Sequence, residues 1–282
     1  MDAKPDENPM SESEATGKTG RVFYAPFGSL GRMAIEWVNY LGASVIFLSK
    51  ALVMMFRPKV FPEIVSQVYY IGARSSGIVM MVGLFTGMVL GLQLFHTLVK
   101  FGSAGVLGSA VGLSLIRELG PVLTAIMITA RAGSAMTAEI GIQRISEQID
   151  ALYTMRIDPV RYLISPRIGA SIISFPLLTA LFDIIGIIGG YITGVVLLGL
   201  NYGTYFYRVQ SSVEMEDITG GFVKSIVFAV IVSTVCCFQG YFAHLRRDSY
   251  GAKAVGLSTT SAVVMSCVLI LVADYVVTSL FL

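Results

Sequence analysis

Long runs of apolar residues alternate with short charged segments along most of this chain. Five runs are long enough to cross a bilayer as helices, because about 20 helical residues match the hydrocarbon thickness. They cover about residues 77–96, 105–130, 168–200, 222–242 and 255–282, and the third is long enough to be tilted or broken. The pattern predicts an all-α integral membrane protein with five transmembrane helices.

The segment at residues 30–56 is apolar on one side only. Polar residues recur there at helical spacing opposite apolar ones, with Arg32, Glu36 and Asn39 facing away from Met33, Trp37 and Leu41. Lys50 interrupts the more apolar second half. Amphipathic helices of this kind usually lie in the membrane interface. We expect an N-terminal interfacial helix here, and a sixth span is the alternative.

The composition also indicates that the bilayer is the solvent. The chain is 55% hydrophobic and 13% charged, with a mean hydropathy of +0.75, whereas soluble domains are about 25% charged. A net charge of +2 argues against nucleic acid as a partner. A length of 282 residues suits one membrane domain and leaves little for a soluble catalytic domain.

The first residues differ from everything that follows. Residues 1–21 are polar and mixed in charge, without the apolar core of a secretory signal, which predicts a disordered cytoplasmic tail. The rest, 22–282, reads as one membrane domain. We divide it into an interfacial region at 22–76 and a helical bundle at 77–282.

Cysteines and histidines give no sign of a metal site or a disulfide framework. Cys236, Cys237 and Cys267 all fall in apolar segments, so we expect them to be small buried hydrophobic residues. His96 and His244 stand alone, without a second ligand at helical spacing. We therefore expect no metal in this chain.

Basic residues are concentrated in alternate loops, which predicts the orientation. The loops that precede the first span, join the second to the third and join the fourth to the fifth are basic: Arg57, Lys59 and Arg74; Arg131, Arg144, Arg156, Arg161 and Arg167; Arg246, Arg247 and Lys253. The other loops carry only Lys100, or Arg208 against three acidic residues. Basic loops stay in the cytoplasm. We expect a cytoplasmic N-terminus and a C-terminus on the outer side.

Arg117 and Glu118 stand side by side within the second apolar run. An ionisable residue at that depth costs a few kcal/mol, so it usually has a task. Either the pair lines a polar cavity or translocation path, or the two charges neutralise each other and lock helix packing. Pro121, after Gly120, predicts a kink that turns the pair toward a cavity, because proline removes a backbone hydrogen bond.

Three further charges fall in apolar runs. Lys224 opens the fourth and Asp274 lies in the fifth. Either Lys224 takes part in a polar site, or its side chain snorkels to the interface. Asp183 lies in the third run, where we expect it to cap backbone groups at a break beyond Pro176, outside the main site.

Glycine recurs every fourth residue in two runs: Gly83, Gly87 and Gly91 in the first, and Gly186, Gly190 and Gly194 in the third. Each series makes a flat strip on one helix face, which allows backbones to approach closely within a membrane. We expect tight packing within one subunit, and a dimer seam is possible for one strip.

The basic loop at residues 131–167 contains a candidate docking helix. Ile142, Ile145, Ile149 and Leu152 step by three and four, which predicts one apolar helix face. Pro159 ends or turns that helix and Pro166 opens the next one. Such a helix suits docking into a groove of another protein, or it rests on the membrane surface.

Short motifs between residues 87 and 167 closely resemble the MlaE family of ABC-transporter permeases. They are Gly87-Met-Val-Leu-Gly-Leu-Gln93, Ile116-Arg-Glu-Leu-Gly-Pro121, Ala130-Arg-Ala-Gly-Ser-Ala135, Ala138-Glu-Ile-Gly141, Glu147-Gln148, Asp158-Pro159 and Ile164-Ser-Pro-Arg167. The resemblance runs from about Pro62 to the C-terminus. It implies a multi-pass permease of a bacterial inner membrane, with the C-terminus in the periplasm, that moves phospholipid between inner and outer membranes.

The resemblance also implies partners. The permease would be a homodimer that works with a cytoplasmic ATPase, a STAS-domain protein and a periplasmic MCE-domain protein. The sequence agrees that ATP hydrolysis belongs elsewhere, because the only hint of a phosphate-binding loop is the Gly-Lys-Thr at residues 17–19. Position 12 there is Glu instead of the required Gly. We expect no cofactor in this chain, with ATP and Mg²⁺ on the partner ATPase.

Two groups of residues are candidates for function. For substrate binding, we expect Arg117, Glu118, Lys224 and Asp274 at the polar end of an apolar cavity, with walls from Leu94, Leu98 and Phe101. Two copies of the second and fifth spans would frame this cavity. For coupling to the ATPase, we expect Arg131, Glu139, Arg144, Glu147 and Asp158 to make contacts or hold the docking helix.

A different class of function is the alternative. In an ion-coupled secondary transporter or channel, Arg117, Glu118, Asp183 and Asp274 would form a proton relay. Inverted repeats or paired broken helices would favour that hypothesis, and the pattern contains neither. A nonconducting scaffold would explain the glycines but not the buried charges.

Overall fold

The computed structural model describes residues 38–39, 41–55, 60–245 and 251–281. The chain divides into two compact units, residues 1–46 and 47–282. In the first unit, residues 38–39 and 41–46 are helical, and residues 41–46 belong to the apolar helix Leu41–Met55. That helix is shorter than the five long ones. Arg32, Glu36 and the remaining positions before residue 38 lie outside the described residues, so the interfacial helix stays a prediction.

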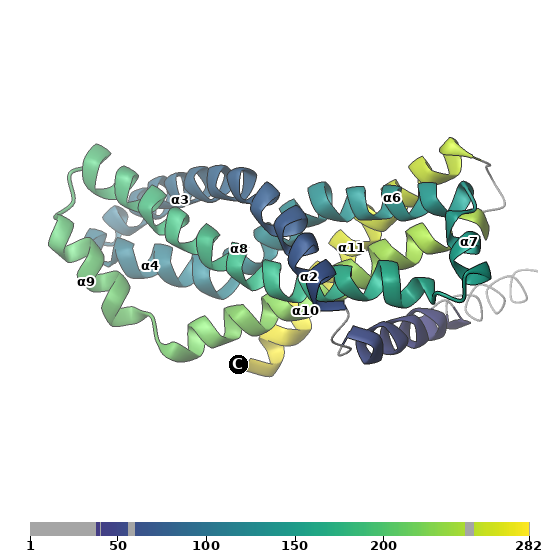
Figure 1. Cartoon of the computed structure of the whole chain (residues 1–282). Coiled ribbons are helices and arrows are strands. Elements are labelled where there is room, and N and C mark those ends of the chain that lie inside the picture. The colour runs from purple at the N-terminus through teal and green to yellow at the C-terminus, as the bar shows by residue number, and fades with distance from the viewer. Residues whose placement is uncertain (1–37, 40, 56–59, 246–250, 282) are drawn as a thin grey trace, which may run out of the picture. The chain divides into compact units, whose positions relative to one another are not determined.

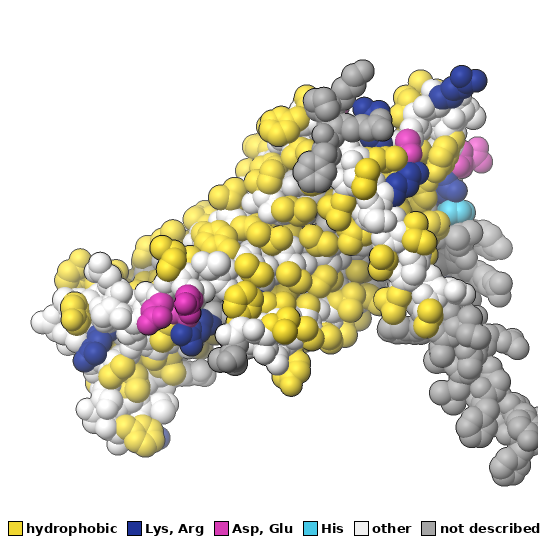
Figure 2. Space-filling model, turned by 90° about the horizontal axis from the view of Figure 1, so that it is seen from below, with side chains coloured by type: hydrophobic (Ala, Val, Ile, Leu, Met, Phe, Trp, Pro, Cys, Tyr) yellow, Lys and Arg dark blue, Asp and Glu magenta, His cyan; other side chains and the backbone are white. Residues whose placement is uncertain are grey.

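The second unit contains five helical stretches long and apolar enough to cross a membrane, which confirms the five predicted spans. They are Phe61–Lys100, Ala104–Ile145, Val160–Leu197, Met215–Tyr241 and Ala252–Phe281. Each predicted run lies within one of them apart from a few residues at its end. In a space-filling view, hydrophobic side chains cover the middle of this unit and charged side chains gather toward its two ends (Figure 2). This distribution is the one expected for a protein that spans a bilayer.

Several stretches combine α-helix with tighter or wider turns. The first two stretches consist of α2 (Phe61–Val68) and α3 (Arg74–Lys100), then α4 (Leu107–Ser114), α5 (Gly120–Ile128) and α6 (Ser134–Ile145). Segments of π-helix join them at Tyr69–Ala73, Leu115–Leu119 and Thr129–Gly133, and a 3₁₀ turn at Ala104–Val106 precedes α4. A π-helical segment, Leu115–Leu119, lies directly before Gly120, at the position where the Gly120-Pro121 kink was predicted.

The remaining elements are α7 (Gln148–Thr154), α8 (Ser165–Tyr191), α9 (Tyr202–Ser212), α10 (Met215–Tyr241) and α11 (Ala252–Phe281). Segments of π-helix at Val160–Ile164 and Ile192–Leu197 flank α8, and a 3₁₀ turn, Ala243–Leu245, follows α10. Among the described residues, no strand interrupts this order. Helix α8 runs through Pro176 without a break, so the expected capping role of Asp183 at a break was wrong.

Both glycine strips pack against other helices inside the chain: the first faces α8, and the second faces Leu115, Val111 and Leu107 of the second stretch. A Cβ added at Gly87 would overlap the carbonyl oxygen of Gly186, and one at Gly91 would lie 3.3 Å from Cα of Gly190. Helices α3 and α8 therefore pack backbone to backbone, and Figure 1 shows them side by side. The predicted packing role within one subunit is confirmed for these glycines.

The predicted docking helix is divided in two. Helix α6 ends at Ile145 and α7 begins at Gln148, because Glu147 between them adopts a left-handed conformation with φ 59°. Ile142 is 58% exposed, whereas Ile149 on the next helix is fully buried. The prediction of one continuous apolar face from Ile142 to Leu152 was therefore wrong.

Candidate functional site

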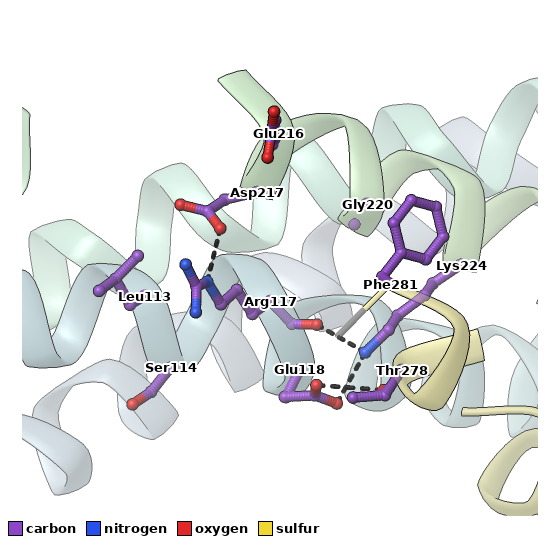
Figure 3. Close-up of a pocket in the computed structure, with 11 residues that line it drawn as sticks. Leu113, Ser114, Arg117, Glu118, Glu216, Asp217, Gly220, Lys224, Thr278 and Phe281 are labelled. Carbon is purple, nitrogen blue, oxygen red and sulfur yellow. Dashed lines mark hydrogen bonds and ion pairs between the residues drawn. The ribbon is translucent and has the colours of Figure 1, made fainter. Parts of the chain in front are cut away.

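A hollow of about 430 Å³ opens where the second, fourth and fifth spans meet. Its lining comes from the segment before α5, from the start of α10 and from the end of α11: Leu113, Ser114, Arg117, Glu118, Glu216, Asp217, Gly220, Gly221, Lys224, Thr278 and Phe281. Figure 3 shows charged side chains of the second span and of α10 turned toward one another, with Thr278 and Phe281 of α11 beside them. The structure thus brings Arg117, Glu118 and Lys224 together, as predicted.

Local backbone features create this meeting point. Pro121 has no N–H to donate to the carbonyl of Arg117 four residues earlier. The ammonium of Lys224 donates to that carbonyl at 2.8 Å. Gly221 permits the close approach of α10, because a Cβ there would lie 2.7 Å from the carbonyl oxygen of Ile116. The Gly-Pro pair and a glycine on α10 therefore define where the second and fourth spans touch.

Lys224 is the centre of the charged cluster. Its side chain is 5% exposed, and its ammonium lies 2.8 Å from a Glu118 oxygen and 3.1 Å from Oδ1 of Asp274. The ammonium also donates a hydrogen bond to the Arg117 carbonyl, so two carboxylates and a carbonyl surround it. Thr278 donates to the other Glu118 oxygen at 3.2 Å. Lys224 does not snorkel; it joins three spans.

Arg117 forms a second, separate ion pair. Its Nε donates to Oδ1 of Asp217 at 2.5 Å, and Asp217 is largely buried while the Arg117 side chain is 52% exposed. The other Asp217 oxygen accepts the backbone N–H of Glu214 in a capping box at the start of α10. The terminal guanidinium nitrogens of Arg117 therefore remain available on the side of the hollow. They are the donors best placed for an incoming anion.

Sequence reasoning missed Asp217 and Glu216 as lining residues. They were read only as acidic residues of an outer loop. The spacing of Glu214 and Asp217 is that of a helix N-cap and its third residue, which would have placed the start of α10 there. That signal could have found the helix start, but not the partner Arg117 a hundred positions away.

The expected apolar walls lie elsewhere. Leu94 and Leu98 are partly buried against the core, and Phe101 is 77% exposed at the end of α3. None of them lines the hollow in the single chain. Their role in a cavity framed by two copies stays a prediction.

Asp183 packs on the other side of the second span. A Cβ added at Gly120 would overlap its Oδ1, so the carboxyl group lies directly against the helix backbone. That oxygen is buried and has no hydrogen-bond partner among the described residues. Asp183 does not line the hollow, which agrees with leaving it out of the predicted core site.

Two of the predicted coupling residues belong to a polar network between spans. Glu139 accepts hydrogen bonds from the hydroxyl of Tyr70 at 2.8 Å and from Arg167 at 2.9 Å. Arg131 donates to Ser75 Oγ at 2.8 Å and to the Tyr70 carbonyl at 3.3 Å. These contacts tie the first, second and third spans together at the end that carries α6.

The other predicted coupling residues lie nearer the surface. Arg144 pairs with Asp150 on α7 at 2.7 Å and donates to Nδ1 of His244 at 3.0 Å. Burial, followed by the neighbouring Arg144 guanidinium, lowers the pKa of His244. Glu147 is exposed at the turn between α6 and α7. Asp158 pairs with Lys50 at 3.0 Å.

The described residues hold no cluster of three or more His, Cys, Asp or Glu side chains placed to bind a metal ion. The chemistry that the hollow can offer is ionic and hydrogen-bonding recognition. Its lining combines one half-exposed guanidinium, three carboxylates and apolar side chains from α4 and α11. A ligand with a charged head and an apolar body fits such a lining.

Comparison with known proteins points in the same direction. The family model described as Permease MlaE matches residues 64–280. A probable ABC transporter permease protein of Rickettsia bellii is 40% identical over 254 residues, which covers 90% of this chain and 96% of the relative. The intermembrane phospholipid transport system permease protein MlaE of Haemophilus influenzae is 39% identical over 256 residues, covering 89% and 95%. The chloroplastic protein TRIGALACTOSYLDIACYLGLYCEROL 1 of Arabidopsis thaliana is 35% identical over 210 residues, covering 74% and 59%.

Proposed function

The chain belongs to the MlaE permease family, and we propose that it is the permease subunit of an ABC transporter that moves phospholipids between two membranes. It is a multi-pass membrane protein and not itself an enzyme. A separate ATPase subunit, with ATP and Mg²⁺, supplies the energy. The relative from Haemophilus influenzae, which carries the phospholipid transport name, aligns over nearly its whole length and so supports this substrate class.

The observation that carries the proposal is the hollow around Arg117. A phospholipid needs apolar walls for its chains and donors for its phosphate, and a guanidinium provides paired donors in a forked geometry. Arg117 has such donors free, since only its Nε is bound to Asp217. Lys224 is already fully occupied by Glu118, Asp274 and a carbonyl. We therefore assign phosphate contact to Arg117, and to Lys224 the task of holding three spans around the site.

Reconstituted transporter tests this assignment. In proteoliposomes, Arg117→Ala should reduce lipid crosslinking and ATP-dependent lipid transfer about tenfold or more, while the melting temperature and the copurified ATPase stay close to wild type. Arg208→Ala, which removes an exposed arginine on α9, is the matched control. Because Arg117→Ala alone leaves Asp217 as a buried unpaired charge, stability and assembly are compared with Asp217→Asn added to the same variant. If the pair only locks packing, the melting temperature and assembly of this double variant fall first. Normal lipid occupancy in a destabilised complex would reject the site.

The ion-coupled alternative has less support in the geometry. A proton relay needs groups that exchange protons along a path. Among its four candidate residues, Arg117, Glu118 and Asp274 are engaged in ion pairs. Asp183 packs against Gly120, outside the hollow. Lipid transfer that requires ATP and persists without an ion gradient distinguishes the two functions.

The remaining partners and the setting are part of the same proposal. We propose a homodimer in a bacterial inner membrane that works with an ATPase, a STAS-domain protein and a periplasmic MCE-domain protein. The basic residues at one end of the spans support a cytoplasmic N-terminus and a periplasmic C-terminus. The exposed apolar residues of α11, such as Val268, Leu271 and Tyr275, support either a lipid or a protein neighbour for that helix.

A further inference from the structure

A second hollow lies within the second unit, between Met54, the start of α2 and the turn that follows α7. Its volume is about 480 Å³, within the range of roughly 300–1,000 Å³ that is common for ligand sites. It shares no residue with the hollow around Arg117. The lining is Met54, Val60, Glu63, Arg156, Ile157, Asp158, Arg161, Tyr162 and Pro166.

Among the described residues, some charged side chains that line this hollow have an ion-pair partner and others have none. Asp158 is paired with Lys50 at 3.0 Å. Glu63 lies in the first turn of α2, where the partial positive charge of the helix N-terminus offsets a carboxylate. Arg156 and Arg161 form no ion pair with any residue that the structure describes. Two guanidiniums without a carboxylate partner among the described residues favour an anion as the occupant of this hollow.

The backbone at Arg156 is a second, independent sign of function. Arg156 has φ 59°, its N–H donates to the Tyr153 carbonyl at 3.0 Å, and the N–H of Ile157 donates to the Leu152 carbonyl at 3.0 Å. These two bonds form the helix-ending motif in which glycine is usual at the left-handed position, since any Cβ is disfavoured there. An arginine at this position strains the backbone. Strained residues concentrate at functional sites, so we infer that the Arg156 guanidinium has a binding role.

The surroundings of the hollow identify the anion. Phe61 and Val65 on α2 and Tyr69 directly after it form an apolar stripe and are 68%, 58% and 65% exposed. The stripe begins next to Val60 in the lining and belongs to a stretch apolar enough to cross the membrane. An acidic protein segment would satisfy the arginines but leave this stripe uncovered. A lipid with a phosphate head and acyl chains covers both.

We propose that this hollow binds the headgroup of an anionic phospholipid, such as phosphatidylglycerol, from the leaflet at the basic end of the chain. Arg156 and Arg161 hold the phosphodiester as paired donors. The acyl chains lie along Phe61, Val65 and Tyr69. Glu63 accepts hydrogen bonds from the hydroxyls of the glycerol head. Basic pockets beside transmembrane helices commonly hold anionic lipid in this way, and the site does not depend on lipid transport through the other hollow.

The backbone conformation of Arg156 provides an unusually clean test. Arg156→Gly removes the guanidinium but relaxes the left-handed backbone, so the melting temperature should stay equal or rise. The transporter complex is placed in nanodiscs of equal parts phosphatidylglycerol and phosphatidylethanolamine, and the lipids retained after detergent extraction are counted. Wild type and the Arg208→Gln control should retain phosphatidylglycerol above its bulk share. Arg156→Gly combined with Arg161→Gln should lose that enrichment at least fivefold.

Two further measurements exclude other occupants. Short-chain phosphatidylglycerol should raise the melting temperature of detergent-solubilised wild type, and inorganic phosphate should not; an equal rise with phosphate overturns the lipid assignment. If the double variant keeps its phosphatidylglycerol enrichment but loses the copurified ATPase, the hollow is a protein-docking site and the proposal is wrong. Unchanged enrichment with unchanged ATPase also overturns it.

Discussion

At the scale of single residues, Lys224 explains why the charged cluster can exist in a membrane. Charges in hydrocarbon are tolerated when they pair with one another or with backbone carbonyls. Lys224 does both, since it contacts two carboxylates and the carbonyl of Arg117. Glu118 and Asp274 lie on different spans, so the two carboxylates depend on one ammonium. The cluster is therefore a structural joint as well as the edge of the site.

This dependence predicts the effect of removing the ammonium. Lys224→Met should leave Glu118 and Asp274 close together without a cation and destabilise the protein by roughly 3 kcal/mol. That value is at the low end for a broken buried pair, because the Glu118 side chain is 42% exposed. Thermal melting in detergent measures it. Adding Glu118→Gln and Asp274→Asn to Lys224→Met should recover most of the loss, and a single variant as stable as wild type would contradict the account.

At the scale of helices, the glycine strips show what a local pattern can predict. A four-residue repeat marks a flat helix face from sequence alone, and the glycine face of α3 packs on the backbone of α8. The spans are predictable for the same reason, since length and hydropathy are properties of one segment. Contacts such as Arg117–Asp217 or Lys224–Asp274 join distant segments, and no local pattern records them.

The division between α6 and α7 was missed for a related reason. The regular spacing of the isoleucines continues across the break between α6 and α7, so this spacing does not indicate where α6 ends. The left-handed residue at the turn is Glu147, whereas glycine is the residue that usually announces such a turn. Arg156, which follows the end of α7, is likewise a non-glycine residue with a left-handed backbone. Sequence patterns therefore do not reveal the helix ends of this fold at which a non-glycine residue adopts the left-handed conformation.

A matched pair of glycine substitutions tests the packing of α3. Gly87→Ala should destabilise the protein by about 1–3 kcal/mol or more, the usual cost of overpacking, because its Cβ would overlap the Gly186 backbone. Gly77→Ala on the same helix meets nothing within 4 Å and should be neutral or slightly stabilising. Melting temperatures and membrane yields of the two variants give the comparison. Equal behaviour of both would contradict the packing of α3 against α8.

At the scale of the whole molecule, the coupling segment is connected to several spans. Arg131, Glu139 and Arg167 tie the first three spans together at the end that carries α6, and Arg144 links α6 to α7 and to the turn after α10. Helix α10 also carries Lys224 at the site. A force on α7 therefore has a continuous packed route to the hollow around Arg117.

Charge reversal in this segment should separate ATP hydrolysis from transport. Arg144→Glu with Glu147→Arg should leave ATP hydrolysis but reduce coupled lipid transfer about tenfold, because reversed charges at an interface typically cost several kcal/mol. Both activities are measured on the same proteoliposomes. Arg144 also pairs with Asp150 within the chain, so a control adds Asp150→Arg to restore that pair. Recovery of transfer by the control would assign the effect to the fold of α7, and full coupled transfer in the double variant would contradict docking.

The distribution of charge along the molecule predicts its orientation in the membrane. Lys50, Arg131, Arg144, Arg156 and Arg161 gather at one end of the spans, while the end with α9 carries Arg208 against acidic residues. Positive loops are retained in the cytoplasm. With Cys236, Cys237 and Cys267 replaced, a single cysteine at Ser11 should be inaccessible to an impermeant thiol reagent in intact cells. One at Gln210, exposed on α9 and clear of the Asn201 cap, should react at once. Permeabilising the inner membrane should then make Ser11 react. Equal labelling of both sites from outside would reverse or abolish the proposed topology, and with it the assignment of α7 to the ATPase side.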